Sequence, residues 1–128
     1  MNHVRYLLPM CVVAGIVLIM QALTYTSLTA TLPLGQFHYD KIQHFGAGAS
    51  CGILGCYLLS LLTGIKRNLH VILSALGMAL AIGVLWEVVE HVWPSINGGS
   101  HSYLSLDTRL DIVLDVLGGL LASLFYRK

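Results

Sequence analysis

Hydrophobic residues are gathered into four long stretches of the chain, and short polar segments separate them. The stretches cover about residues 6–28, 42–62, 69–92 and 110–126. A helix needs about 20 apolar residues to cross a bilayer, and each stretch has about that length. The pattern predicts an all-α integral membrane protein, a four-helix bundle that forms a single transmembrane domain over residues 1–128.

The composition agrees with a membrane protein and excludes several other classes. Hydrophobic residues make up 56% of the chain and charged residues only 10%, whereas an ordinary soluble domain has about 25% charged residues. A mean hydropathy of +0.78 excludes a disordered chain. Three cysteines are too few for a disulfide-stapled secreted module. The net charge of +1 gives no basic surface for nucleic acid, which we exclude as a partner.

Basic residues predict the orientation of the four spans. We interpret the first stretch as an uncleaved helix, because its apolar run is longer than that of a typical secretory signal. Four spans then place both termini and the link between the second and third spans on one side. Five of the seven basic residues lie there: Arg5, Lys66, Arg67, Arg127 and Lys128. The positive-inside rule places both termini in the cytoplasm of a bacterial or archaeal cell, in a multi-pass inner-membrane protein.

All six acidic residues fall near the opposite, extracytoplasmic ends of the spans. Asp40 and His44 are four residues apart, as are Glu87 and His91, so each pair shares a helix face. The last span carries acids at every fourth position: Asp107, Asp111 and Asp115. Three helices thus bring acids and imidazoles to a similar depth, and we expect one polar pocket.

Such a pocket requires cations, because a charged side chain costs about 2.5–3.5 kcal/mol at mid-bilayer. Lys41 and Arg109 are too few to balance six acids. A divalent metal or shared protons complete the site. Oxygen and imidazole ligands without thiolate suit zinc, manganese or iron. We expect His44, Glu87 and Asp111 to hold the metal, with Asp115 and His91 within reach, Glu90 as general base and Arg109 as a head-group contact. Asp40 and Asp107 support the site.

Other residues have simpler interpretations. Asp107 is expected to cap the last span, and His38 and His101 are expected in solvated loops. We interpret Cys51 and Cys56 as buried apolar thiols. Small residues repeat at intervals of four, as in Gly48 and Gly52, and such faces let helices pack closely within one chain or in a homodimer.

The leading hypothesis from these residues is metal-assisted chemistry on, or binding of, an envelope lipid or its head group. The second is a dimeric transporter that uses the same acids as a proton or cation relay. The third is a structural membrane module whose polar network only fixes helix packing.

The polar motifs also resemble those of the VanZ-like membrane proteins. Asp40-Lys41-x-x-His44 is similar to the DKxxH motif of that family, and Glu87-x-x-Glu90 to its ExxQ motif. Arg109, Asp111, Asp115 and Gly118 resemble its R…DxxxNxxGxxxG pattern. Glutamate and aspartate stand where that family usually has glutamine and asparagine, so this chain is closer to uncharacterised, more acidic relatives. The resemblance implies a small helical membrane protein of the cell envelope but no reaction. It also implies one site, which contains Asp40, His44, Glu87, Asp111 and Asp115.

Overall fold

Four helices make up the regular structure in the computed structural model, which describes residues 4–25, 35–64, 67–92 and 106–126. They are α1 (Val4–Tyr25), α2 (Gly35–Thr63), α3 (Asn68–Val92) and α4 (Leu106–Tyr126). No strand occurs in these segments. The predicted all-α, four-helix class is therefore confirmed for this part of the chain.

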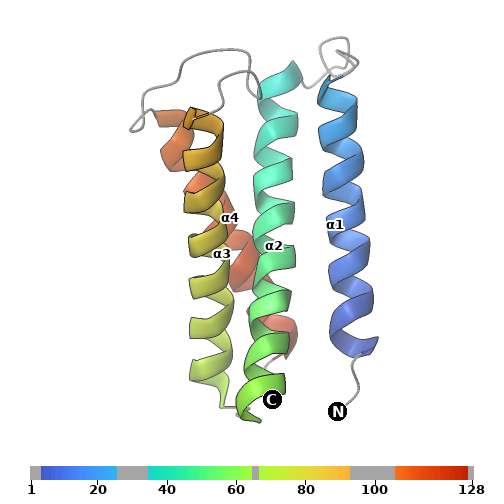
Figure 1. Ribbon diagram of the computed structural model, residues 1–128, viewed down its shortest axis with the longest axis vertical. Coiled ribbons are helices and arrows are strands. Elements are labelled where there is room, and N and C mark those ends of the chain that lie inside the picture. The colour runs from blue at the N-terminus through green and yellow to red at the C-terminus, as the bar shows by residue number, and fades with distance from the viewer. Residues whose placement is uncertain (1–3, 26–34, 65–66, 93–105, 127–128) are drawn as a thin grey trace.

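The helices run alternately up and down. α1 begins and α4 ends at the end of the bundle where α2 ends and α3 begins (Figure 1). At that end, α2 stops at Thr63, and Gly64 has a φ of 65°. This left-handed conformation is the usual end of a helix and is accessible to glycine without steric cost. It allows α3 to start again within a few residues, antiparallel to α2.

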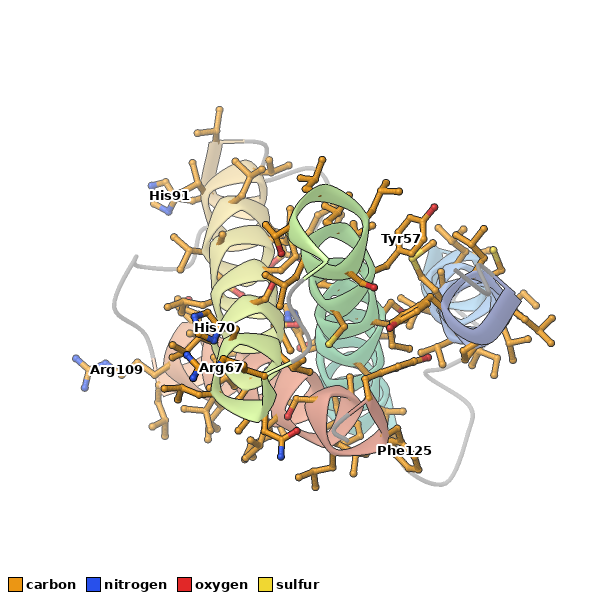
Figure 2. All side chains as sticks on the ribbon, turned by 90° about the horizontal axis from the view of Figure 1, so that it is seen from below. Tyr57, Arg67, His70, His91, Arg109 and Phe125 are labelled. Atoms are coloured by element: carbon orange, nitrogen blue, oxygen red, sulfur yellow. The ribbon has the colours of Figure 1, made fainter. Side chains whose placement is uncertain are left out.

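α2 is the central helix, since it packs against each of the other three, and α3 also packs against α4. α1 lies at the side of this three-helix core (Figure 2). The four-helix bundle is thus a core of α2, α3 and α4 with one peripheral helix.

Small residues allow the core helices to approach closely. A Cβ built on Gly48 would overlap the backbone of Asp115, and a Cβ on Gly52 would lie 2.7 Å from Cα of Gly119. Between α3 and α4, a Cβ on Gly119 would lie 2.6 Å from that of Ala79. The small-residue faces identified in the sequence are therefore occupied by contacts within one chain.

Two helices begin earlier than the hydrophobic pattern predicts. α2 was expected from residue 42 and begins at Gly35, and α4 was expected from residue 110 and begins at Leu106. His38 lies inside α2, so its assignment to a loop was wrong; His101 lies outside the described residues. Asp107 lies in the first turn of α4 rather than before it. Hydropathy misses these turns because they contain polar residues, and two of these, Lys41 and Asp107, form an ion pair between the two helices.

Two helices are long and apolar enough to cross a membrane, over Asp40–Thr63 and Asn68–Val92. A shorter apolar segment lies in α1, over Tyr6–Ile19. Large apolar side chains are exposed on the outside of the described helices, for example Leu18 at 69% and Leu85 at 57%. This apolar exterior is compatible with contact to lipid.

The end of the bundle at which α4 ends is held by aromatic contacts. Tyr6 of α1 stacks on Tyr126 of α4 with ring centroids 4.7 Å apart, and its ring also lies 5.7 Å from that of Tyr57 in α2. We call these three residues the tyrosine cluster. Beside them, Cys56, Val71 and Ala75 form a buried apolar core. Cys56 is thus a buried free thiol, as predicted, whereas Cys51 is half-buried.

Candidate functional site

The opposite half of the core contains a group of ionisable side chains that we call the acidic cluster. It comes from all three core helices, and its members are Asp40, Lys41, His44, Glu87, Asp107, Asp111 and Asp115. The spacing of four residues in α2 and in α4 places the acids on the faces that meet, as predicted. The close approach of α2 and α4, for example at Gly48 and Gly118, brings the two faces together.

Lys41 joins α2 to the first two turns of α4. Its Nζ donates to Asp40 Oδ2 at 2.9 Å, to Asp107 Oδ1 at 2.5 Å and to Asp111 Oδ1 at 2.5 Å. The Lys41 side chain is 13% exposed, so these contacts are shielded from water. One ammonium thus offsets the mutual repulsion of three carboxylates. The sequence had suggested only a general pairing role for this residue.

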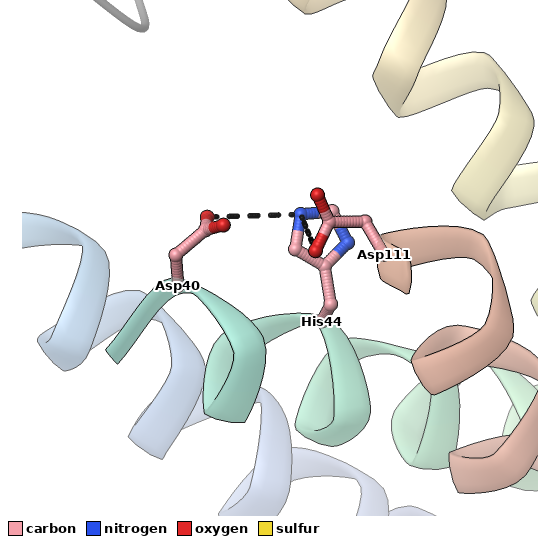
Figure 3. A group of neighbouring side chains, drawn as sticks. All are labelled: Asp40, His44 and Asp111. Carbon is pink, nitrogen blue, oxygen red and sulfur yellow. Dashed lines mark ion pairs between the residues drawn. The ribbon is translucent and has the colours of Figure 1, made fainter. Parts of the chain in front are cut away.

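Both ring nitrogens of His44 face carboxylates. One carboxylate lies beside Nδ1, and three lie around Nε2. Nδ1 is 3.1 Å from Asp115 Oδ2, within hydrogen-bond distance. Nε2 lies 3.8 Å from Asp40 Oδ1, 3.8 Å from Asp111 Oδ1 and 4.0 Å from Glu87 Oε1. These three separations are too long for hydrogen bonds. Figure 3 shows the Asp40 and Asp111 carboxylates close to the His44 ring.

Glu87 supplies the contribution of α3 to the cluster. Its side chain is 10% exposed, and Oε1 is buried without a hydrogen-bond partner. A buried carboxylate oxygen without a partner is costly and rare in folded proteins. Here the unpartnered oxygen is the atom that lies 4.0 Å from His44 Nε2. It is therefore directed at the same space as the Asp40 and Asp111 oxygens.

Two groups of three side chains offer ligand atoms that lie within 4.8 Å of one another: Asp40, His44 and Asp111, and His44, Glu87 and Glu90. His44 is common to both. The structure places carboxylates of Glu87, Asp111 and Asp40 around His44 Nε2. Asp115 contacts the other nitrogen of the ring. Glu90 Oε1 also accepts a hydrogen bond from Trp86 Nε1, at 2.7 Å.

Two predicted site residues belong neither to the acidic cluster nor to the two groups of ligand atoms. Arg109 is exposed, and its side chain projects away from the bundle (Figure 2). It lies two residues from both Asp107 and Asp111, which places it on the opposite side of α4 from these acids. His91 also projects outward, from the end of α3 (Figure 2). It belongs to neither group of clustered ligand atoms in the described residues.

The acidic cluster carries more negative than positive charge. Five carboxylates, from Asp40, Glu87, Asp107, Asp111 and Asp115, surround one ammonium and one imidazole. Even with His44 protonated, a cluster of fully ionised acids is deficient in positive charge. The arrangement can accommodate a cation or shared protons. An anion would meet repulsion unless a cation or shared protons were also present.

Comparisons with known proteins give one match. The sequence model of a family described as "Predicted membrane protein (DUF2238)" matches residues 2–128. No curated protein and no solved structure gives a significant match. The family description agrees with the membrane class expected from hydropathy, and it does not refer to the VanZ-like proteins. Because the match extends over nearly the whole length, the chain belongs to this family of predicted membrane proteins.

Proposed function

We propose that this protein holds a divalent metal ion in the acidic cluster and uses it to bind, or to act on, the head group of an envelope lipid. The single observation that carries the proposal is the environment of His44 Nε2. Three carboxylate oxygens surround this nitrogen at 3.8–4.0 Å. They belong to Asp40 on the same helix, Glu87 on α3 and Asp111 on α4. An imidazole nitrogen with carboxylates at this distance is a suitable set of ligands for zinc, manganese or iron.

The separations are close to those of a bound metal. Ligand atoms about 2.0–2.1 Å from a tetrahedral ion lie roughly 3.4 Å from one another. The oxygens around Nε2 are a few tenths of an ångström further out, a difference that side-chain rotation can remove. His44 and Asp111 would be the central ligands, Asp40 the third, and Glu87 the fourth, through its unpartnered oxygen. Asp115 would remain on Nδ1.

The negative charge of the cluster supports an order of binding in which a metal binds first and a lipid phosphate binds second. Carboxylates in excess of nearby cations repel a phosphate, and a divalent ion reverses the local field that the phosphate meets. The metal would then polarise a phosphoryl oxygen or lower the pKa of a bound water. Glu90, one turn above Glu87, is placed to act as a base at the edge of this site. Arg109 would meet a head group only outside the cluster.

Membrane placement follows from the same arrangement. We propose a multi-pass protein of a bacterial or archaeal inner membrane with the acidic cluster on the extracytoplasmic side and both termini in the cytoplasm. The basic residues of the α2–α3 link support this orientation. The relation to the VanZ-like proteins is also a proposal, carried by the shared Asp40-Lys41-x-x-His44 motif.

A cation or proton relay is the second candidate, and the contact from Lys41 through Asp111 and His44 to Asp115 favours it. This chain of polar groups leads from the half-exposed Asp107 into the core. Beyond Asp115, however, the same face of α4 continues with Gly118, Gly119, Ala122 and Ser123. In the described residues it therefore ends inside the core, as expected of a site and not of a path. A purely structural network is the third candidate.

The test is the metal content of protein purified in detergent without chelator or immobilised-metal resin. We expect near-stoichiometric zinc, manganese or iron in the wild type, and none in a His44→Ala/Glu87→Ala variant. His70→Ala is the matched control, because His70 lies at the opposite end of α3 and its loss leaves the cluster intact (Figure 2). Elemental analysis measures the metal, and thermal unfolding verifies that each variant folds.

Lipid phosphates are then screened for binding and hydrolysis with the metal-loaded protein. Absence of metal from the wild type after supply of zinc, manganese and iron would reject the metal site. Uptake of protons or cations by liposomes that contain the metal-free protein would then favour the relay. Full stability of the double variant together with loss of activity would reject the structural module.

A further inference from the structure

We propose that Asp115 is a positioning residue, which holds the His44 ring with a proton on Nδ1 and so directs Nε2 at Asp40, Glu87 and Asp111. This inference deepens the metal site proposed above and rests on it for the metal-binding part of its test. Sequence spacing had placed Asp115 among the metal ligands. Its position in the structure gives it a different task.

The contact between Asp115 and His44 determines which ring nitrogen carries the proton. Asp115 Oδ2 lies 3.1 Å from Nδ1, and both residues are buried, with exposed fractions of 2% and 5%. An ionised carboxylate can only accept hydrogen bonds, so Nδ1 is the donor. The lone pair of a neutral ring then lies on Nε2, the nitrogen that faces the other three carboxylates. Metal-ligating histidines are commonly oriented by a carboxylate on their second nitrogen in this way.

Two glycines fix the place of Asp115. Gly48, one turn after His44 on α2, lies against the Asp115 backbone so closely that a Cβ there would overlap it. On the other side, a Cβ on Gly83 of α3 would lie 2.6 Å from Asp115 Oδ2. The carboxylate thus occupies a space that exists only because α3 has no side chain at this position. The backbone contact sets the register of α4 relative to His44.

Among the ionisable side chains of the described residues, His44 is the one that lies within hydrogen-bond distance of Asp115. Lys41, the other nearby cation, binds Asp40, Asp107 and Asp111. The shortest charged contact of Asp115 in the described residues is the one to His44 Nδ1. A role for Asp115 in the site therefore acts through the imidazole, and not by direct contact with a ligand on the Nε2 side.

The test uses protein with ¹⁵N-labelled histidine in detergent, measured by NMR without metal and after addition of zinc. The His44 resonances are identified by their loss in His44→Gln. We expect Nδ1 to carry a proton in both states and Nε2 to shift on zinc binding. In Asp115→Asn, the amide can donate to Nδ1 or accept from it, so we expect the preference for protonated Nδ1 to disappear and the zinc Kd to rise about 10–100-fold.

A second variant avoids a change at the buried acid. Gly83→Ala places a methyl group against the end of a flexible carboxylate, so the helices can keep their positions while Asp115 Oδ2 moves. Gly77→Ala is the matched control on α3, because a Cβ there meets nothing within 4 Å. We expect weaker zinc binding and an altered Nδ1 signal in Gly83→Ala only.

The possible outcomes separate this inference from the metal site. A wild type with an unprotonated Nδ1, with zinc on Nδ1, or with a zinc Kd that neither Asp115→Asn nor Gly83→Ala changes would overturn the positioning role. A wild type that binds no zinc but has a protonated Nδ1 that depends on Asp115 would support the positioning of His44 and reject the metal.

Discussion

The two ends of the helical bundle are stabilised by different interactions. The tyrosine cluster, which includes Tyr6 of α1, and the adjacent Cys56, Val71 and Ala75 use ring stacking and close apolar packing. The acidic cluster uses ion pairs and hydrogen bonds among α2, α3 and α4. Apolar packing is non-directional and tolerates small rearrangements, whereas buried ionic groups need each partner in place. One end is thus suited to stability, and we propose that the other binds a cation.

The largest expected effect comes from breaking the contact that serves both ends. In Gly118→Val, the new side chain would meet the backbone of Phe45 and Ala49 and separate α4 from α2. We expect a loss of at least about 3 kcal/mol in the free energy of unfolding, with zinc binding lost as well. Circular dichroism and size-exclusion chromatography in detergent measure the outcome. The control is Gly77→Val, where there is open space; equal loss in both variants would contradict close α2–α4 packing.

A smaller effect, confined to the acidic end, is expected from Lys41→Met. Removal of the ammonium leaves Asp40, Asp107 and Asp111 without their shared partner. Removal of one partner from a buried ionic group costs about 3 kcal/mol, and we expect that loss in metal-free protein. The added negative charge should also tighten zinc binding, so that zinc restores part of the stability. Unfolding followed with and without zinc tests both points. Arg109→Met, on the exposed side of α4, should change neither quantity.

At the other end, Tyr6→Leu should loosen α1 without an effect on the acidic cluster. An aromatic pair contributes about 0.5–1.5 kcal/mol beyond its burial, and the loss should lie in that range. Tyr126→Leu should cost a similar amount, and the double variant less than the sum, because both substitutions remove the same stacked pair. An unchanged zinc Kd in all three variants is expected. Weaker zinc binding would mean that the two ends are coupled through α4.

Two neighbouring acids of α3 sharpen the comparison within the acidic end. Glu87→Gln removes a charge whose Oε1 is directed at His44, and we expect the zinc Kd to rise more than about 10-fold, since even indirect partners of a metal contribute that much. Glu90→Gln retains an oxygen that can accept from Trp86 and should change the Kd little. Isothermal titration of the two variants measures the difference. The reverse order would place the metal among His44, Glu90 and their neighbours.

Cysteines introduced at the two ends should have the smallest effect on stability. They give the most direct test of the orientation of the protein in the membrane. Arg67→Cys and Arg109→Cys, each made in a chain whose Cys11, Cys51 and Cys56 are replaced by alanine, both replace exposed residues, so neither should itself alter folding. In intact cells, a membrane-impermeant thiol reagent should label Cys at position 109 and not at position 67, because we place the acidic end outside. Labelling after cell lysis provides the control for reactivity. Labelling of position 67 alone would reverse the proposed orientation.

Periodicity in the sequence predicted the four helices and most of the acidic cluster. The intervals of four residues in α2 and α4 determine a shared face regardless of tertiary structure. The same geometry could have excluded Arg109, since a residue midway between Asp107 and Asp111 lies on the opposite side of the helix. The outward direction of the His91 side chain could not be predicted in this way, because the interval of four residues places it on the same helix face as Glu87.

The remaining features depend on how the helices are placed relative to one another. The contacts of Lys41 with Asp107 and Asp111 require the first turns of α4 to lie beside α2, which no local pattern specifies. The role of Asp115 depends on the absence of a side chain at Gly83, on a third helix. The peripheral position of α1 was also hidden, because its apolar residues are equally compatible with a core or with lipid.

The dependence of α4 on its neighbours has a consequence for biosynthesis. α2 and α3 contain segments long and apolar enough to cross a bilayer, whereas α4 brings Asp107, Asp111 and Asp115 into the core and is synthesised after them. Lys41 and His44 are already present on α2 when these acids leave the ribosome. In a membrane, the nascent α2–α3 hairpin would act as an intramolecular receptor for α4, so that insertion of α4 and assembly of the ionic centre become a single event.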